Sequence, residues 1–227
     1  MTDYSLGAAL AGLQATPTEP WAATQIPLGD GRFDLLAPDP GAVDLPAMAD
    51  RLAKIARFGG GTPSEIWSVA AHSVLVEQVL IHRRPAAASA RLCCLALLHD
   101  FHEAAIGDLT RQLRTALIRV GGPDMAAALQ QLTAPIDAAI WQAVGIDPPD
   151  AAEADLIAQA DSLAAAIEWR ALIPHPDRPA DMPDPPRWSA LRPQPWPMDA
   201  AALLDRLAAR ATDLTLTGPA IAALRVR

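Results

Sequence analysis

Between residues 45 and 174 the chain alternates alanine- and leucine-rich stretches with short glycine or proline breaks, and this punctuation limits the folds open to it. The breaks stand at residues 59–61, 85, 121–123 and 145–149. Alanine and leucine favour helix, glycine and proline end it, and apolar residues recur at helical spacing within the stretches. The pattern predicts an all-α body, with helices at residues 45–57, 64–82, 86–103, 110–119, 124–144 and 151–172.

The two ends of the chain have different patterns. Gly29-Asp30-Gly31 separates residues 24–27 from residues 32–36, which indicates a small β-hairpin; the alternative is an irregular arm packed on the helices. Closely spaced prolines in residues 173–198 exclude a continuous helix and favour an extended strap, held down by Trp188 and Trp196. A last helix is expected at residues 199–214. We expect one domain of 227 residues, with an arm (1–44), a core (45–174), the strap (175–198) and a C-terminal helix and tail (199–227).

Composition excludes several classes of function. A formal net charge of -8 argues against a broad basic surface for duplex nucleic acid. No apolar run approaches the roughly 18 to 20 residues that cross a bilayer, and residues 1–14 lack the basic start of a signal peptide. The adjacent Cys93 and Cys94 lie inside an apolar run, where core packing in a reducing compartment is expected. The sequence therefore predicts a soluble, cytoplasmic protein without a membrane partner.

Polar residues of metal-binding type interrupt the apolar stretches. His99 and Asp100 close an apolar run at residues 92–98, which predicts a buried helix that delivers both side chains to the interior. His72 shares a helical face with Val76 and Val79, so it is expected to point inward too. A bound cation would compensate the burial of these groups.

A second set of acidic residues extends this pattern. Asp161 lies on an alanine-lined helical face, where it is either a buried ligand or part of a solvated face, and Asp155 is the competing ligand in the same helix. Glu103 follows His99 by four residues, so on a continuing helix it would lie one turn along the same face. Asp108 follows the Gly107 break and is expected to point back to the same place.

The donor set constrains the metal. Imidazole and carboxylate ligands suit zinc, manganese, cobalt, nickel or ferrous iron, and magnesium also stays open. Because no cysteine takes part, an open catalytic site is favoured over a closed structural one. Such an ion lowers the pKa of bound water from 15.7 towards roughly 7 and withdraws charge from a phosphoryl oxygen. The guanidinium groups of Arg57, Arg111 and Arg114 match phosphate oxygens, although Arg111 and Arg114 could equally be solvent-facing residues at a helix start.

Several short segments, in order, resemble the HD superfamily of metal-dependent phosphohydrolases, and in particular its 5′-deoxynucleotidase branch. These are residues 70–73 (Ala-Ala-His-Ser), 97–103 (Leu-Leu-His-Asp-Phe-His-Glu), 107–109 (Gly-Asp-Leu) and 159–161 (Gln-Ala-Asp). The resemblance covers about residues 51–174. Phe58 stands where the family has tryptophan, and Ala71 where it has glutamate.

This resemblance implies an HD-domain bundle of about six to seven helices. It implies that one divalent metal ion per subunit is held by His72, His99, Asp100 and Asp161, and that Glu103 acts as acid or base with support from Asp108. It further implies that Arg57 and Phe58 contact the nucleotide, and that the protein is a homodimer.

The expected function is hydrolysis of deoxynucleoside 5′-monophosphates to nucleoside and phosphate. Three alternatives stay open on sequence grounds. The first is a triphosphohydrolase that acts on deoxynucleoside triphosphates. The second is a nucleotide-binding protein without turnover. The third is a purely structural metal, in which case replacing Glu103 by alanine would leave activity unchanged.

Overall fold

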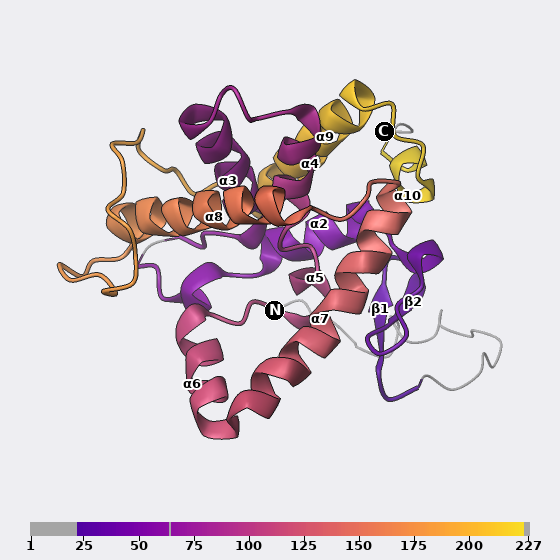
Figure 1. The fold of residues 1–227 in the computed structure, drawn as a ribbon, viewed down its shortest axis with the longest axis horizontal. Helices are drawn as coiled ribbons and strands as arrows, with labels where there is room; N and C mark the ends of the chain where they lie inside the picture. The colour runs from indigo at the N-terminus through magenta and orange to yellow at the C-terminus, as the bar shows by residue number, and fades with distance from the viewer. Residues whose placement is uncertain (1–21, 64, 225–227) are drawn as a thin grey trace, which may run out of the picture.

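The helices of this computed structural model pack around α3 (Val69–Arg83), which is buried on most of its surface (Figure 1). The structure describes residues 22–63 and 65–224. Helix α3 contacts α2, α4, α8 and α9. A helix that is buried on most of its sides belongs in the centre of a core, so α3 organises the fold. The remaining α-helices are α2 (Leu45–Lys54), α4 (Ala90–Leu98), α5 (Glu103–Ile106), α6 (Arg111–Gly121), α7 (Pro123–Val144), α8 (Ala151–Leu172), α9 (Trp196–Asp213) and α10 (Pro219–Ala222).

The expected hairpin is present as β1 (Gln25–Leu28) and β2 (Gly31–Asp34), which pair antiparallel with Ile26 opposite Phe33. Gly29 has a φ of +56°, a sign that two-residue hairpin turns require and that glycine adopts at little cost. The Phe33 side chain is fully buried and anchors the hairpin on the helices. The prediction of a mostly helical fold with a small hairpin is therefore confirmed.

The predicted helix at residues 86–103 is wrong. Helix α4 begins after Ser89, whose side chain accepts a hydrogen bond from the Leu92 amide, and it ends at Leu98. Residues 99–102 form a tight turn, in which the Phe101 amide bonds the Leu98 carbonyl, and α5 then starts at Glu103. The turn replaces the continuing helix on which Glu103 was expected to lie.

Other boundaries differ less. Helix α3 starts at Val69 rather than residue 64, because the Ser68 side chain caps it there. Between α2 and α3 the chain makes a short 3-10 turn, η2 (Arg57–Gly60), and a second such turn, η1 (Pro40–Ala42), precedes α2. Helix α8 matches its predicted bounds, since Asp150 and Glu153 form a reciprocal capping box at its start.

The proline-rich strap runs between α8 and α9 without regular structure. Trp188 packs against the core and meets the His82 ring edge-on, with the ring centroids 5.4 Å apart. Trp196 is the first residue of α9 and is 45% exposed, and the Lys54 ammonium of α2 lies 4.0 Å from its ring centroid.

Helix α6 and the first half of α7 form a hairpin that extends away from α3 and α4 (Figure 1). Helix α6 has no buried residue. Its first turn nevertheless reaches the pocket described below. Within residues 22–63 and 65–224, no helix combines the length and the apolar character that spanning a bilayer demands.

Candidate metal centre

Three separate parts of the chain bring the four predicted ligands together. His72 comes from α3, His99 and Asp100 from the turn after α4, and Asp161 from α8. The Nε2 atom of His72 lies 3.0 Å from Asp161 Oδ1 and 3.6 Å from Asp100 Oδ2. The Nε2 atom of His99 lies 3.0 Å from the same Asp100 oxygen. Two imidazoles and two carboxylates thus converge on one place.

Both imidazoles are held through the nitrogen that faces away from this centre. The Nδ1 atom of His72 lies 2.7 Å from Glu168 Oε1, and the Nδ1 atom of His99 lies 2.8 Å from the Ala96 carbonyl oxygen. Each Nδ1–H donates to these acceptors, so each Nε2 can offer its lone pair to a metal ion. This is the hydrogen-bonding pattern of histidine ligands in metalloproteins.

Three buried polar atoms without a hydrogen-bond partner lie at this site, and a fourth belongs to Trp169 on the far side of the pocket. Over the described part of the chain they are His72 Nε2, His99 Nε2, Glu103 Oε2 and the indole nitrogen of Trp169. Nearly all buried polar groups in folded proteins have a hydrogen-bond partner, so a cluster of unpaired ones indicates a place where an ion or ligand binds. Although Asp161 Oδ1 is near His72 Nε2, it does not satisfy that atom with hydrogen-bond geometry.

The residues present fit a metal ion. Ligand atoms of His72, His99 and Asp100 all lie within 4.8 Å of one another, so these three residues could hold one ion. Asp161 falls outside that tight group but faces it through His72. Its rival Asp155 is exposed and accepts a hydrogen bond from Gln159, four residues along α8, so it takes no part.

Glu168 is the main site residue to which the sequence assigned no role. Its fully buried carboxylate accepts hydrogen bonds from Trp67 Nε1 at 2.7 Å and from the Arg57 guanidinium at 3.1 Å, in addition to the bond from His72. It lies seven residues after Asp161, on the same face of α8. That spacing is the signal that would have found it.

The charges of the first ligands are mutually dependent. Burial alone lowers the pKa of His99, but the Asp100 carboxylate outweighs it and raises that pKa to about 9. Burial raises the pKa of Asp100, but His99, His72 and Arg57 outweigh it and leave that pKa below its ordinary value. For His72, burial and Arg57 favour the neutral ring, while Glu168 and Asp161 prevail and raise its pKa. An added cation would displace the protons that these rings carry in its absence.

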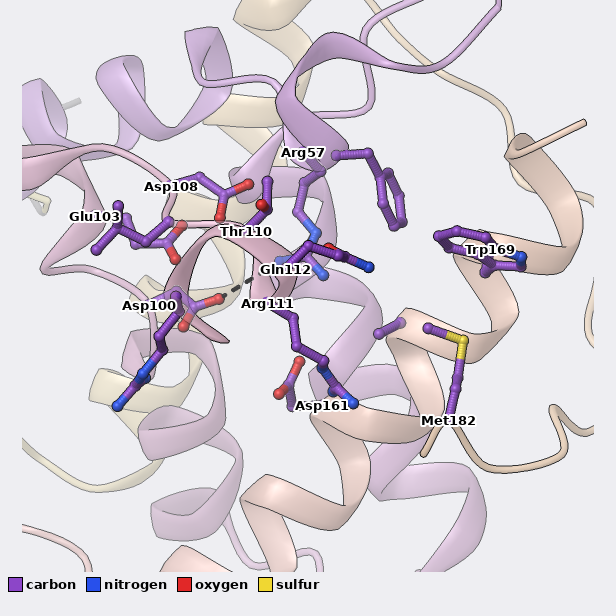
Figure 2. A pocket seen from close by; sticks show the side chains of 14 residues that line it. Arg57, Asp100, Glu103, Asp108, Thr110, Arg111, Gln112, Asp161, Trp169 and Met182 are labelled. Carbon is purple, nitrogen blue, oxygen red and sulfur yellow. Dashed lines mark ion pairs between the residues drawn. The ribbon is translucent and has the colours of Figure 1, made fainter. Parts of the chain in front are cut away.

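Two further carboxyl groups, those of Glu103 and Asp108, stand beside the candidate ligands. Glu103 is 8% exposed, and burial together with the nearby Asp100 and Asp108 charges raises its pKa to about 9. Burial also raises the pKa of Asp108, with Asp100 adding to the effect. Figure 2 shows both carboxyl groups on the same side of the pocket as Asp100.

A pocket of about 290 Å³ opens over this group of carboxylates (Figure 2). Its lining includes the six predicted residues outside the ligand set, namely Arg57, Phe58, Glu103, Asp108, Arg111 and Arg114, together with Asp100 and Asp161. Of the three arginines, Arg57 forms an ion pair with Glu168 and lies 4.0 Å from Asp100. Its positive charge therefore compensates part of the negative charge of these buried carboxylates. Burial lowers the pKa of Arg57, but Glu168 and Asp100 reverse this and keep it charged. Arg111 pairs with Asp181 of the strap at 3.2 Å.

The remaining histidines and cysteines have structural surroundings. His102 Nδ1 lies 3.0 Å from Asp137 Oδ1, next to the ligands but oriented by a different partner. His82 lies in the last turn of α3. Cys93 and Cys94 are buried and free, and burial raises the pKa of Cys94 to about 12, so neither is an activated thiolate.

Comparison with known proteins adds little to this picture. No protein-family profile matches the chain. The chain is similar to an uncharacterized protein of Rhodobacter capsulatus, with 36% identity over 96 residues. The match covers 42% of this chain and 48% of that protein, so it spans about half the length of the relative. That protein has no stated activity, so it carries no function over to this chain.

Proposed function

We propose that this chain is a metal-dependent phosphohydrolase that releases phosphate from deoxynucleoside 5′-monophosphates. The observation that carries the proposal is the pair of buried Nε2 atoms of His72 and His99, both unpaired and both held by a second bond at Nδ1. With Asp100 and Asp161 they would hold one divalent ion. The resemblance to the HD superfamily and its deoxynucleotidase branch supports the same assignment.

When bound, a divalent ion would supply a nucleophile at neutral pH and withdraw charge from a phosphoryl oxygen. The chain's own residues provide the rest. Arg111 and Arg114 line the pocket and offer guanidinium donors to the phosphate oxygens. Glu103, beside Asp100 and largely buried, orients the attacking water or passes a proton to the leaving 5′-oxygen. Asp108 supports Glu103 through its adjacent charge.

The size of the pocket favours the monophosphate. A volume of about 290 Å³ lies just below the range of roughly 300 to 1,000 Å³ for small-molecule sites. A triphosphate would also need more positive charge than this pocket offers, since Arg57 is already paired with Glu168 and Arg111 with Asp181. Release of triphosphate is therefore the less favoured reaction.

The test is a screen of nucleoside mono-, di- and triphosphates with zinc, manganese, cobalt, nickel, iron and magnesium, in which the products are identified. We expect free phosphate from deoxynucleoside 5′-monophosphates. Glu103→Gln should lower kcat by about 10²- to 10⁴-fold, as loss of a general acid or base does. Asp155→Asn, which changes an exposed acid on α8, should keep full activity.

Three outcomes would contradict the proposal. Triphosphate as the product would replace it by the triphosphohydrolase reaction. Nucleotide binding without hydrolysis by any metal form would indicate a sensing or interaction protein. Unchanged activity in Glu103→Gln would show that Glu103 takes no part in the reaction and would favour a structural metal.

A further inference from the structure

The pocket has two chemically different ends. Carboxylates and arginines line the end above the metal ligands, whereas the other end is lined by Phe58, Ala165, Trp169 and Met182. In Figure 2, Trp169 and Met182 lie across the pocket from Asp100 and Glu103. A ligand that fills both ends must therefore carry an anionic group at one end and an apolar, preferably flat, group at the other.

Phe58 reaches this end through an unusual backbone. Its φ of 57° and ψ of 24° lie in the left-handed region, which few residues other than glycine adopt. The following Gly59 and Gly60 also have positive φ, which glycine adopts without steric strain because it has no Cβ atom. Phe58 has a Cβ atom, so its backbone conformation is strained. Strained residues of this kind cluster at ligand sites, where the surrounding structure holds them. Here the conformation places an aromatic ring in the pocket wall.

The rings of Phe58 and Trp169 form an edge-to-face pair, with centroids 6.1 Å apart and planes at 73°. A third ring cannot lie between them, because that requires two nearly parallel rings about 7 Å apart, twice the carbon contact distance of about 3.5 Å. A flat ligand would instead lie against one ring face, with the other ring as a side wall. Such stacking tolerates many bases, since every base has a π-face.

Met182 closes this end from the strap. Its side chain is 7% exposed and packs with Ala165, Ala166 and Trp169 in a small cluster that is separate from the main core. Hydrogen bonds from Arg170 to the Pro185 and Pro186 carbonyls hold the strap on α8. A flexible, polarizable thioether suits contact with aromatic rings of varying shape. The strap thus contributes a wall of the pocket and does more than link α8 to α9.

We propose that Phe58, Trp169 and Met182 form a cradle for the planar heterocyclic base of the ligand, and that this cradle selects phosphate monoesters that carry a base over base-free sugar phosphates. The inference rests on the proposed function, which supplies the phosphate end of the same pocket. The three residues come from η2, α8 and the strap, so selection of the base depends on a segment outside the metal centre.

The test compares kcat/KM for a deoxynucleoside 5′-monophosphate and for 2-deoxyribose 5-phosphate, which lacks the base. The wild-type protein should prefer the nucleotide by about tenfold or more. Trp169→Ala should lower kcat/KM for the nucleotide by about 5- to 100-fold, the range expected for lost stacking. Met182→Ala should lower it by about 2- to 10-fold, the range expected for a lost thioether–aromatic contact. Both variants should change kcat/KM for the sugar phosphate by less than about twofold. Trp169→Phe and Met182→Leu should keep most of the preference.

Trp196→Ala is the matched control, because this tryptophan is exposed at the start of α9 and outside this pocket. It should change neither rate. Equal losses on both substrates in the Trp169 and Met182 variants would overturn the cradle and leave these residues a packing role. Equal rates of the wild-type protein on both substrates would overturn it as well.

A binding experiment separates this inference from the proposed function. If neither substrate releases phosphate, the hydrolase assignment fails, and calorimetry with a deoxynucleoside that has no phosphate then tests the cradle alone. Binding to the wild-type protein that weakens by about twofold or more in Met182→Ala supports the cradle. A wild-type protein that does not bind the deoxynucleoside, or a variant that binds it equally well, contradicts it.

Discussion

The carboxylate of Glu168 lies 2.7 Å from Nδ1 of His72, and both side chains are fully buried. Burying a carboxylate is costly unless hydrogen bonds replace those it made to water. Besides His72, the Trp67 indole and the Arg57 guanidinium donate such bonds to Glu168. Burial raises the pKa of Glu168, but Arg57 and His72 outweigh it and keep that pKa below its ordinary value. A charged Glu168 therefore fixes the orientation of the His72 ring.

Replacing Glu168 by glutamine should weaken divalent metal binding by about 10- to 100-fold, the usual effect of losing the acceptor behind a histidine ligand. Metal titration followed by calorimetry measures this directly. Trp67→Phe removes one donor but keeps the carboxylate, so it should change the affinity far less. Equal affinity in wild type and Glu168→Gln would show that His72 does not depend on this partner.

Asp161 and Asp155 lie on the same helix and give opposite predictions. Asp161→Asn replaces a carboxylate oxygen beside His72. It should lower the metal affinity by at least 10- to 100-fold, the usual effect of losing a residue that only hydrogen-bonds to a ligand. Asp155→Asn should leave the affinity unchanged, because Asp155 is exposed and bonded to Gln159. The same pair can be compared by thermal unfolding, since a metal at 100 times its Kd stabilises the folded state by about 2.7 kcal/mol. A chelator should reverse the metal-induced gain in Tm. If Asp161→Asn and Asp155→Asn both lost that gain, Asp161 would be rejected as the specific ligand.

Metal affinity should rise with pH. In the metal-free protein the Asp100 charge outweighs burial and raises the pKa of His99 to about 9. Below that pH the ring must lose a proton before it can bind a metal, so affinity should fall by up to about tenfold per pH unit for one proton. Calorimetry at pH 6, 7 and 8 in buffers of different ionisation enthalpy counts the protons released. An affinity that stays constant over this range would contradict the proposed ligand.

The stability of the metal-free protein should fall as pH rises, in part because of Glu103. Burial and the Asp100 and Asp108 charges raise its pKa from 4.5 to about 9. Between these values the folded protein holds a proton that the unfolded chain has released, so stability is fully present below about pH 4.5 and is lost towards pH 9. Glu103→Gln should therefore be more stable than wild type at pH 8, with a smaller difference at pH 5.

Urea unfolding with a chelator present measures this effect. Asp155→Asn serves as the control, because an exposed acid should give nearly the same difference from wild type at both pH values. A gain in Glu103→Gln that does not depend on pH would mean that the substitution acts through packing and not through the lost charge.

The sequence predicted the ends of a helix well where contacts between residues close in the chain determine them. Helix α8 has its predicted bounds because the capping box at Asp150 and Glu153 is a contact within four residues. The helix at residues 86–103 was wrong because neither glycine nor proline interrupts that stretch, and the turn at 99–102 gives no local signal. That turn directs His99 and Asp100 towards α3 and α8, which is a tertiary requirement.

The sequence by itself determined a mostly helical chain with a hairpin, and it singled out the residues that converge on the site, since helical periodicity and residue type are properties of neighbours along the chain. Only the tertiary structure decided what pairs with them. Glu168 is 96 residues from His72, Arg57 is 111 residues from Glu168, and Met182 reaches Trp169 through a segment without periodicity. Burial makes such partners obligatory, but it is the packing of α3 against α8 that determines which residues meet.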